Sequence, residues 1–269
     1  MTRPMSPWIR VLLLVNALVM ASQAIGLLVP ASIPFPVTVS PLNARFIGAL
    51  YLAGVVGMVI SAAGRQAADA RILLLDIALV SLVLLAVTLG YWGDFTARRI
   101  PLIWLTVYAL DPIAAGASFL ALRSLGPARP GRHRFSGVFT GASIVFLVVG
   151  LLLLLTPGVA LALWPWKLTP LLAQVYAPFF LAFALGCWLA AGETRTPAVL
   201  PVVASTACLA IGVLVASTLH LDRFVPGLAT GAWFAAFGAA LVIFGYALFR
   251  LSRPMKQPAL ADSSTDIGP

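Results

Sequence analysis

Residues 136–156 read SGVFTGASIVFLVVGLLLLLT and contain no charged side chain. About 20 mostly apolar residues form a helix long enough to cross the hydrocarbon core of a bilayer. Seven further apolar runs of this kind lie at 9–29, 46–63, 72–91, 102–122, 171–191, 198–219 and 231–250. The pattern predicts an all-α integral membrane protein with eight transmembrane helices.

The composition of the whole chain agrees with this prediction. Of 269 residues, 61% are hydrophobic and only 9% are charged, whereas soluble domains carry about 25% charged residues. This excludes a soluble enzyme, a disordered chain and a disulfide scaffold. The net charge of +9 does not indicate a nucleic-acid partner, because the basic residues lie in short loops between apolar runs, where they orient a protein in an anionic membrane.

The basic residues are distributed unequally between alternate loops. One side carries twelve of the 17, namely Arg3, Arg10, Arg65, Arg71, Arg123, Arg129, Arg132, Arg134, Arg195, Arg250, Arg253 and Lys256. The other side carries five, namely Arg45, Arg98, Arg99, Lys167 and Arg223. Basic loops stay in the cytoplasm, so we expect a multi-pass protein of the cell membrane with both termini inside. The excess of Arg over Lys suggests a bacterial source.

A repeat with a spacing of 129 residues relates the two parts of the chain. The segment PVTVSPLNA at 36–44 aligns with PWKLTPLLA at 165–173, and Trp104 aligns with Trp233. Four helices per half is an even number, so both halves enter the membrane from the same side. We therefore expect two parallel four-helix repeats, residues 1–135 and 136–250, followed by a disordered cytoplasmic tail, 251–269.

Asp111 is the main candidate for a functional residue. It lies about ten residues into its apolar run, which at 1.5 Å per residue places it about 15 Å deep in the membrane. Ionisable residues at that depth usually mark a path for an ion or a substrate. Pro112 leaves the carbonyl of Tyr108 without its helical partner, so both residues are candidates for ligand binding or proton coupling. Alternatively, Asp111 joins helices by bonding to Tyr108, Asn16 or Gln23.

Two further residues are weaker candidates for the same site. Asp76 lies five residues after Arg71 and differs from Asp111 in depth by about 10 Å, which argues against a tight carboxylate pair. In the repeat, Asp76 aligns with Ser205 and Asp111 with Ala240, so an acidic site would belong to the first half. Arg45 follows the first repeat segment at the outer surface, where it can meet an anionic head group.

The sequence contains no motif for metal, cofactor or nucleophile chemistry. The chain has 2 histidines, one in a loop and one at a helix end, too few for a haem held within the bundle. His-Glu-x-x-His, phosphate-loop and Gly-x-Ser-x-Gly motifs are missing. We therefore expect no cofactor, no metal and no assigned catalytic residue.

These observations favour binding or transport of a small or lipid-like molecule between the two halves. Membrane lipids are the expected partners, and the sequence names no protein partner. Two alternatives stay open: an accessory or assembly protein without catalysis, and a membrane-embedded enzyme acting on a lipid.

Overall fold

The computed structural model describes residues 3–25, 28–29, 39–94, 102–122 and 132–252. Its α-helices are α1 (Pro7–Ala24), α2 (Pro41–Ala62), α3 (Arg71–Gly90), α4 (Leu102–Leu122), α5 (Ser136–Leu155), α6 (Pro157–Leu163), α7 (Pro170–Ala191), α8 (Thr196–Thr218) and α9 (Leu228–Ser252). Three short 3₁₀ helices are η3 (Ala67–Ala70), η4 (Trp92–Asp94) and η6 (Leu221–Arg223). All α-helices except α6 are long and apolar enough to cross a membrane. The predicted set of eight apolar helices is confirmed.

Polar residues cap two of the helices that begin before their predicted apolar runs: α2 begins at 41 instead of 46, and α7 at 170 instead of 171. The hydroxyl of Ser40 accepts a hydrogen bond from the Asn43 amide at 3.3 Å, and α2 starts at the next residue, a proline. Thr169 caps α7 in the same way, accepting from the Leu172 amide at 3.2 Å. Proline suits the first helical position, since that position needs no amide donor.

The other differences from the predicted boundaries are small. The first apolar run was predicted to reach residue 29, but α1 ends at Ala24. The short helix α6 was not predicted; Thr156 leaves the α-helical conformation and the proline after it starts a new helix. Helix α9 continues to Ser252, so the first two residues of the predicted disordered tail are helical. The rest of that tail lies outside the described residues.

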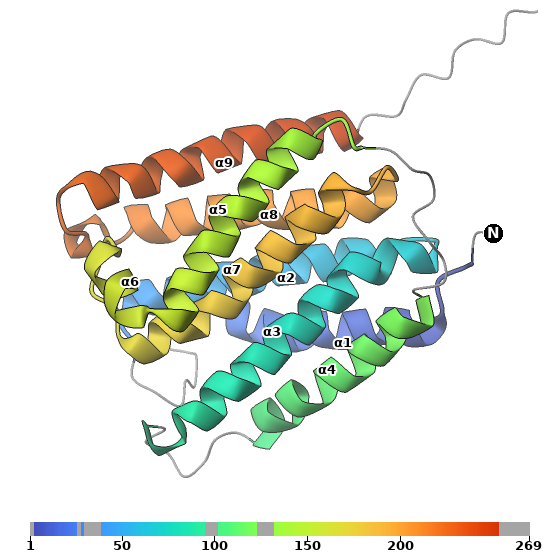
Figure 1. Cartoon of the computed structure of the whole chain (residues 1–269), viewed down its shortest axis with the longest axis horizontal. Coiled ribbons are helices and arrows are strands. Elements are labelled where there is room, and N and C mark those ends of the chain that lie inside the picture. The colour runs from blue at the N-terminus through green and yellow to red at the C-terminus, as the bar shows by residue number, and fades with distance from the viewer. Residues whose placement is uncertain (1–2, 26–27, 30–38, 95–101, 123–131, 253–269) are drawn as a thin grey trace, which may run out of the picture.

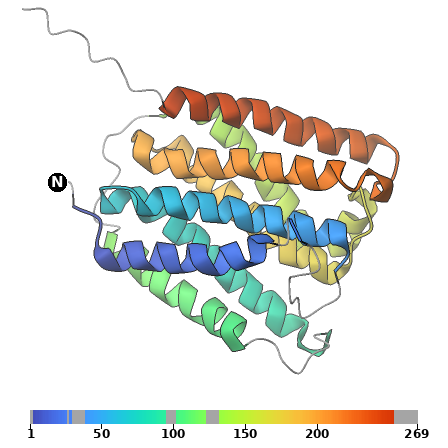
Figure 2. The same ribbon diagram turned by 180° about the vertical axis from the view of Figure 1, so that it is seen from behind.

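The long helices form two layers. In one layer α9, α8, α2 and α1 lie side by side, each packed on the next (Figure 2). In the other layer the order is α5, α7, α3 and α4 (Figure 1). Each layer therefore contains helices from before and after residue 135, and α2 packs along α8 while α7 packs along α3. The most buried spans are α2, α7 and α8, whereas α4 and α9 expose most of their surface.

The bundle has two ends, which we name by residues that lie there. The Arg195 end carries the first described residues, η3 and the start of α8; its strand-like contact between Pro4 and Gln66 ties the N-terminal segment to the chain before η3. The Trp166 end carries the starts of α2 and α7. There the backbone at Trp166 pairs with that at Phe224.

Candidate functional site

Asp111 lies buried within α4 and joins three helices. Its carboxylate accepts a hydrogen bond from Asn16 Nδ2 on α1 at 3.1 Å and from Ser81 Oγ on α3 at 3.3 Å. The same Asn16 amide group also lies 3.2 Å from the carbonyl of Leu12. Asn16 is one of the three partners that the helix-joining interpretation named. The geometry is what that interpretation requires, because both carboxylate oxygens are occupied by donors from neighbouring helices.

Tyr108 lies near Asp111 but bonds elsewhere. Its hydroxyl is 3.3 Å from the hydroxyl of Tyr51 on α2. Both residues line a small cavity of about 40 Å³, which we call the lateral cavity, together with Asn16, Gln23 and Ser81. The Oε1 atom of Gln23 is buried and has no hydrogen-bond partner among the described residues. Tyr108 and Asp111 thus line one cavity, although no hydrogen bond joins them within the described part of the chain.

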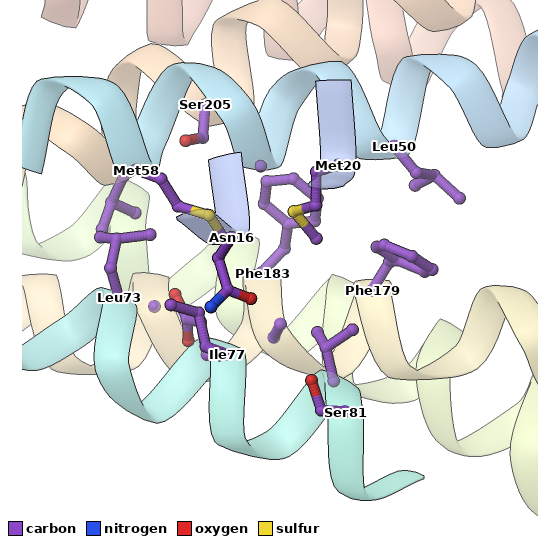
Figure 3. Close-up of a pocket in the computed structure, with 16 residues that line it drawn as sticks. Asn16, Met20, Leu50, Met58, Leu73, Ile77, Ser81, Phe179, Phe183 and Ser205 are labelled. Carbon is purple, nitrogen blue, oxygen red and sulfur yellow. The ribbon is translucent and has the colours of Figure 1, made fainter. Parts of the chain in front are cut away.

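A second cavity, of about 70 Å³, lies between helices of both halves, and we call it the central cavity. Its walls come from α1, α2 and α3 on one side and from α7 and α8 on the other. Figure 3 shows the Asn16 side chain projecting into it, with the sulfurs of Met20 and Met58 nearby. Asp76 and Ser205 also line this cavity. Within the described part of the chain, Asp76 Oδ1 and Ser205 Oγ are buried and accept or donate no hydrogen bond.

Glycines on the facing helices make room for these two side chains. A Cβ atom at Gly186 on α7 would lie 3.1 Å from Asp76 Oδ2. A Cβ atom at Gly57 on α2 would collide with Ser205 Oγ. A side chain at either glycine would therefore fill the space that the carboxyl or the hydroxyl now occupies. Each polar group consequently lies against the backbone of a helix from the opposite half.

The two cavities share part of their walls. Asn16 and Ser81, the two donors to Asp111, line both of them. Asp76 therefore lines the same cavity as Asn16 and Ser81, the two residues that donate to Asp111. Ser205, Gly57 and Gly186 were not selected as site residues from the sequence, although the 129-residue alignment pairs Ser205 with Asp76 and Gly186 with Gly57.

A charged network joins the two halves at the Arg195 end. Arg195, which precedes α8, lies 3.4 Å from Asp69 of η3 and donates to the Ala68 carbonyl at 3.3 Å. It also pairs with Glu193 at 2.9 Å. Burial alone would raise the pKa of Glu193, but the hydrogen bonds from Arg195 outweigh it and lower that pKa below its ordinary value. The hydrogen bond with Glu193 in turn raises the pKa of Arg195.

An uncharged network joins the halves at the Trp166 end. Asn43 Oδ1 on α2 accepts hydrogen bonds from Trp166 Nε1 at 2.7 Å and from the Tyr176 hydroxyl at 3.0 Å. The ring of Phe46 lies 5.5 Å from that of Trp166 and 4.7 Å from that of Tyr176. The central cavity thus lies between two contacts that connect the halves, one at each end of the bundle.

Arg45 is not part of either cavity. It is half-buried near the Trp166 end, and its Nε atom has no hydrogen-bond partner in the described part of the chain. Burial lowers the pKa of the nearby His220, and the charge of Arg45 lowers it further. The structure therefore places Asp111 and Tyr108 on the lateral cavity and Asp76 on the central cavity, whereas Arg45 lines neither.

Among the described residues, no group of three or more His, Cys, Asp or Glu side chains could hold a metal ion. Comparison with known proteins finds no family model, curated sequence or solved structure that matches the chain. A function must therefore be argued from the cavities and their residues.

Proposed function

We propose that the chain consists of two parallel four-helix repeats, with both termini in the cytoplasm of a bacterial cell. The packing supports the repeat: when residues are shifted by 129, the pair α2–α8 corresponds to α7–α3, α1–α2 to α5–α7, and α3–α4 to α8–α9. The same shift relates Gly57 to Gly186 and Asp76 to Ser205, which form the two matching close approaches. The sequence assigns twelve basic residues, Arg195 among them, to one side of the membrane, which supports placing the Arg195 end in the cytoplasm.

The proposed function is binding of a small polar solute or a proton in the central cavity, and its passage between the halves. One observation carries this proposal: Asp76 Oδ1 and Ser205 Oγ are buried in a cavity between helices of the two halves, and no described residue forms a hydrogen bond with either atom. Buried polar atoms are almost always paired, and leaving one unpaired costs about 1–3 kcal/mol. A bound ligand or a proton can supply the missing partner, so unpaired buried polar atoms in a cavity are typical of a binding site.

The dimensions of the cavity favour a small occupant over a lipid. At about 70 Å³ it has room for a few heavy atoms. The networks around Asp69–Arg195 and Asn43–Trp166 connect the halves on either side of it. Opening one network while the other stays closed would expose the cavity to one side of the membrane at a time, which is the alternating access of transporters built from repeats.

The test compares two acids that differ in place. Wild-type protein, Asp76→Asn and the control Asp94→Asn, which changes an exposed acid of η4, are purified in mild detergent for native mass spectrometry. The same proteins are placed in vesicles containing a pH-sensitive dye, and a membrane potential is applied. We expect a retained small molecule or a proton flux that Asp76→Asn abolishes and Asp94→Asn keeps. A wild-type protein that shows neither contradicts the proposal.

A second candidate function, an accessory or assembly protein without a site, is favoured by the bonding of Asp111. Its two donors, Asn16 and Ser81, satisfy it as a structural residue that holds α1, α3 and α4 together. If the protein is an accessory protein of this kind, Asp76→Asn leaves its biological activity in cells unchanged. A lipid-acting enzyme has less support, because Asp76 and Asp111 line different cavities.

A further inference from the structure

A third cavity lies at the Arg195 end, on the face formed by α3, α4 and α7. Its volume is about 290 Å³, and Arg71 and Glu193 are the charged residues that line it. The remaining walls are mostly apolar side chains, among them Ile72, Leu75 and Phe119. Helix α3 lies between α4 and α7 in Figure 1, so the cavity is a cleft over the start of α3. It shares no lining residue with the central or the lateral cavity.

Arg71 is a cation to which the described residues supply no acidic partner. Its Nε atom is buried and has no hydrogen-bond partner in the described part of the chain, and its guanidinium carbon lies 5.7 Å from the centre of the Phe119 ring. The acid on the cleft wall, Glu193, is already bonded to both Nε and Nη2 of Arg195, at 3.1 and 2.9 Å. Arg71 also stands at the start of α3, where a cation opposes the helix dipole. Helix stability therefore does not account for this arginine.

The other end of the cleft has the character of a membrane interface. Trp188 on α7 lines the cleft and is 62% exposed. Exposed tryptophans of membrane proteins lie at the level where head groups meet the hydrocarbon chains. The apolar wall beyond it, which includes Leu75, has no polar side chain to hold a water-soluble ligand. The cleft thus combines a cation that no described acid pairs with an apolar surface that is partly exposed at Trp188.

We propose that this cleft binds an anionic phospholipid, with its phosphate against the Arg71 guanidinium and an acyl chain along Leu75 and Trp188. An arginine fork fits a phosphate through two parallel hydrogen bonds. In the proposed orientation the Arg195 end faces the cytoplasmic leaflet, which is rich in anionic lipids. The inference requires that the chain is in a membrane but does not depend on solute transport.

The test is native mass spectrometry of the full-length protein, delipidated in mild detergent and titrated with phosphatidylglycerol or with phosphatidylcholine of the same acyl chains. Arg71→Gln is compared with Arg65→Gln, which removes an equal charge from an exposed position at the same end. We expect one phosphatidylglycerol to bind at least about fivefold more tightly than phosphatidylcholine. This preference is lost in Arg71→Gln and kept in Arg65→Gln, and circular dichroism checks that each variant is folded.

Three outcomes would overturn the proposal. One is equal binding of the two lipids by the wild type, and another is equal loss in both arginine variants. The third is displacement of the lipid by inorganic phosphate beyond what chloride of the same ionic strength causes, which would assign the cleft to a free anion. Arg71→Lys keeps the charge without the fork and should bind with intermediate affinity. None of these readouts involves solute passage, so failure here and failure of the transport proposal are separate results.

Discussion

The two acids that line the central and lateral cavities, Asp76 and Asp111, should respond differently to mutation. Asp111→Ala removes the acceptor of two interhelical hydrogen bonds, from Asn16 and from Ser81. Such bonds contribute on average about 0.6 kcal/mol and at most about 1.7 kcal/mol each in membrane proteins. Their loss therefore lowers the free energy of unfolding by about 1–3 kcal/mol. Asp76 Oδ1 has no hydrogen-bond partner within the described part of the chain. We therefore expect Asp76→Asn to change the free energy of unfolding by less than about 0.5 kcal/mol or to increase it.

Both effects are measured by unfolding the protein in mild detergent with heat or with a denaturant. A double-mutant cycle separates the bonds of Asp111 from other consequences of the substitution. Asn16→Ala and Ser81→Ala should each lose much of their own effect when Asp111 is already alanine, because the shared bond is gone. This coupling should reach about 0.5–1.5 kcal/mol per pair.

Two results would refute this reasoning. If Asp111→Ala unfolds like the wild type, the bonds to Asn16 and Ser81 do not hold the helices together, and Asp111 regains its place as the main functional candidate. If Asp76→Asn is the more destabilised variant, the Asp76 carboxyl has a structural partner. The proposal that the central cavity binds a solute or a proton then no longer has its main support.

Three further predictions concern the central cavity and the two networks that connect the halves on either side of it. Gly57→Ala forces a methyl group against Ser205 and should lower the free energy of unfolding by about 1–3 kcal/mol; Ser205→Ala should recover more than half of this in the same assay. Asn43→Leu leaves two buried donors unpaired and should cost about 1–3 kcal/mol for each, measured by unfolding in urea. Because the pKa of Glu193 is lowered in the folded protein, its carboxylate stabilises the fold at pH values above the ordinary glutamate pKa of about 4.3. This stabilisation is lost as the pH falls through the pKa of the folded state. Melting temperatures recorded from pH 6 to pH 3 should therefore fall less steeply in Glu193→Gln.

The helices were predictable because hydropathy reports directly on membrane-length apolar segments. Two of the errors lie where a polar residue sets a helix start: Ser40 and Thr169 start α2 and α7 outside the apolar runs, by accepting hydrogen bonds from backbone amides three residues later. Both signals are visible in the sequence, since each cap is followed by a proline. A search for caps as well as for apolar runs would have placed both starts.

The hydrogen-bond partners of the site residues were less predictable than the helices, because the expected depth of a residue in the membrane does not show which residues it contacts. Asp111 is deep, but Asn16 and Ser81 lie 95 and 30 residues away in sequence, and no local pattern shows that they meet it. Arg195 was counted only as a charge that orients the chain. Its contact with Asp69 spans 126 residues and depends on how η3 approaches the start of α8. Such pairings follow from the packing of whole helices, which hydropathy does not encode.

The proposed repeat explains why only one of two equivalent positions carries an acid. Asp76 and Ser205 are related by the 129-residue shift and approach the same cavity of about 70 Å³ from opposite halves. Two carboxylates in so small a volume would repel each other, and at least one would have to stay protonated. A hydroxyl at the second position keeps a donor and acceptor without that repulsion. The difference between the halves is therefore what a single site on the axis between two repeats requires, whereas two independent sites would each need their own acid.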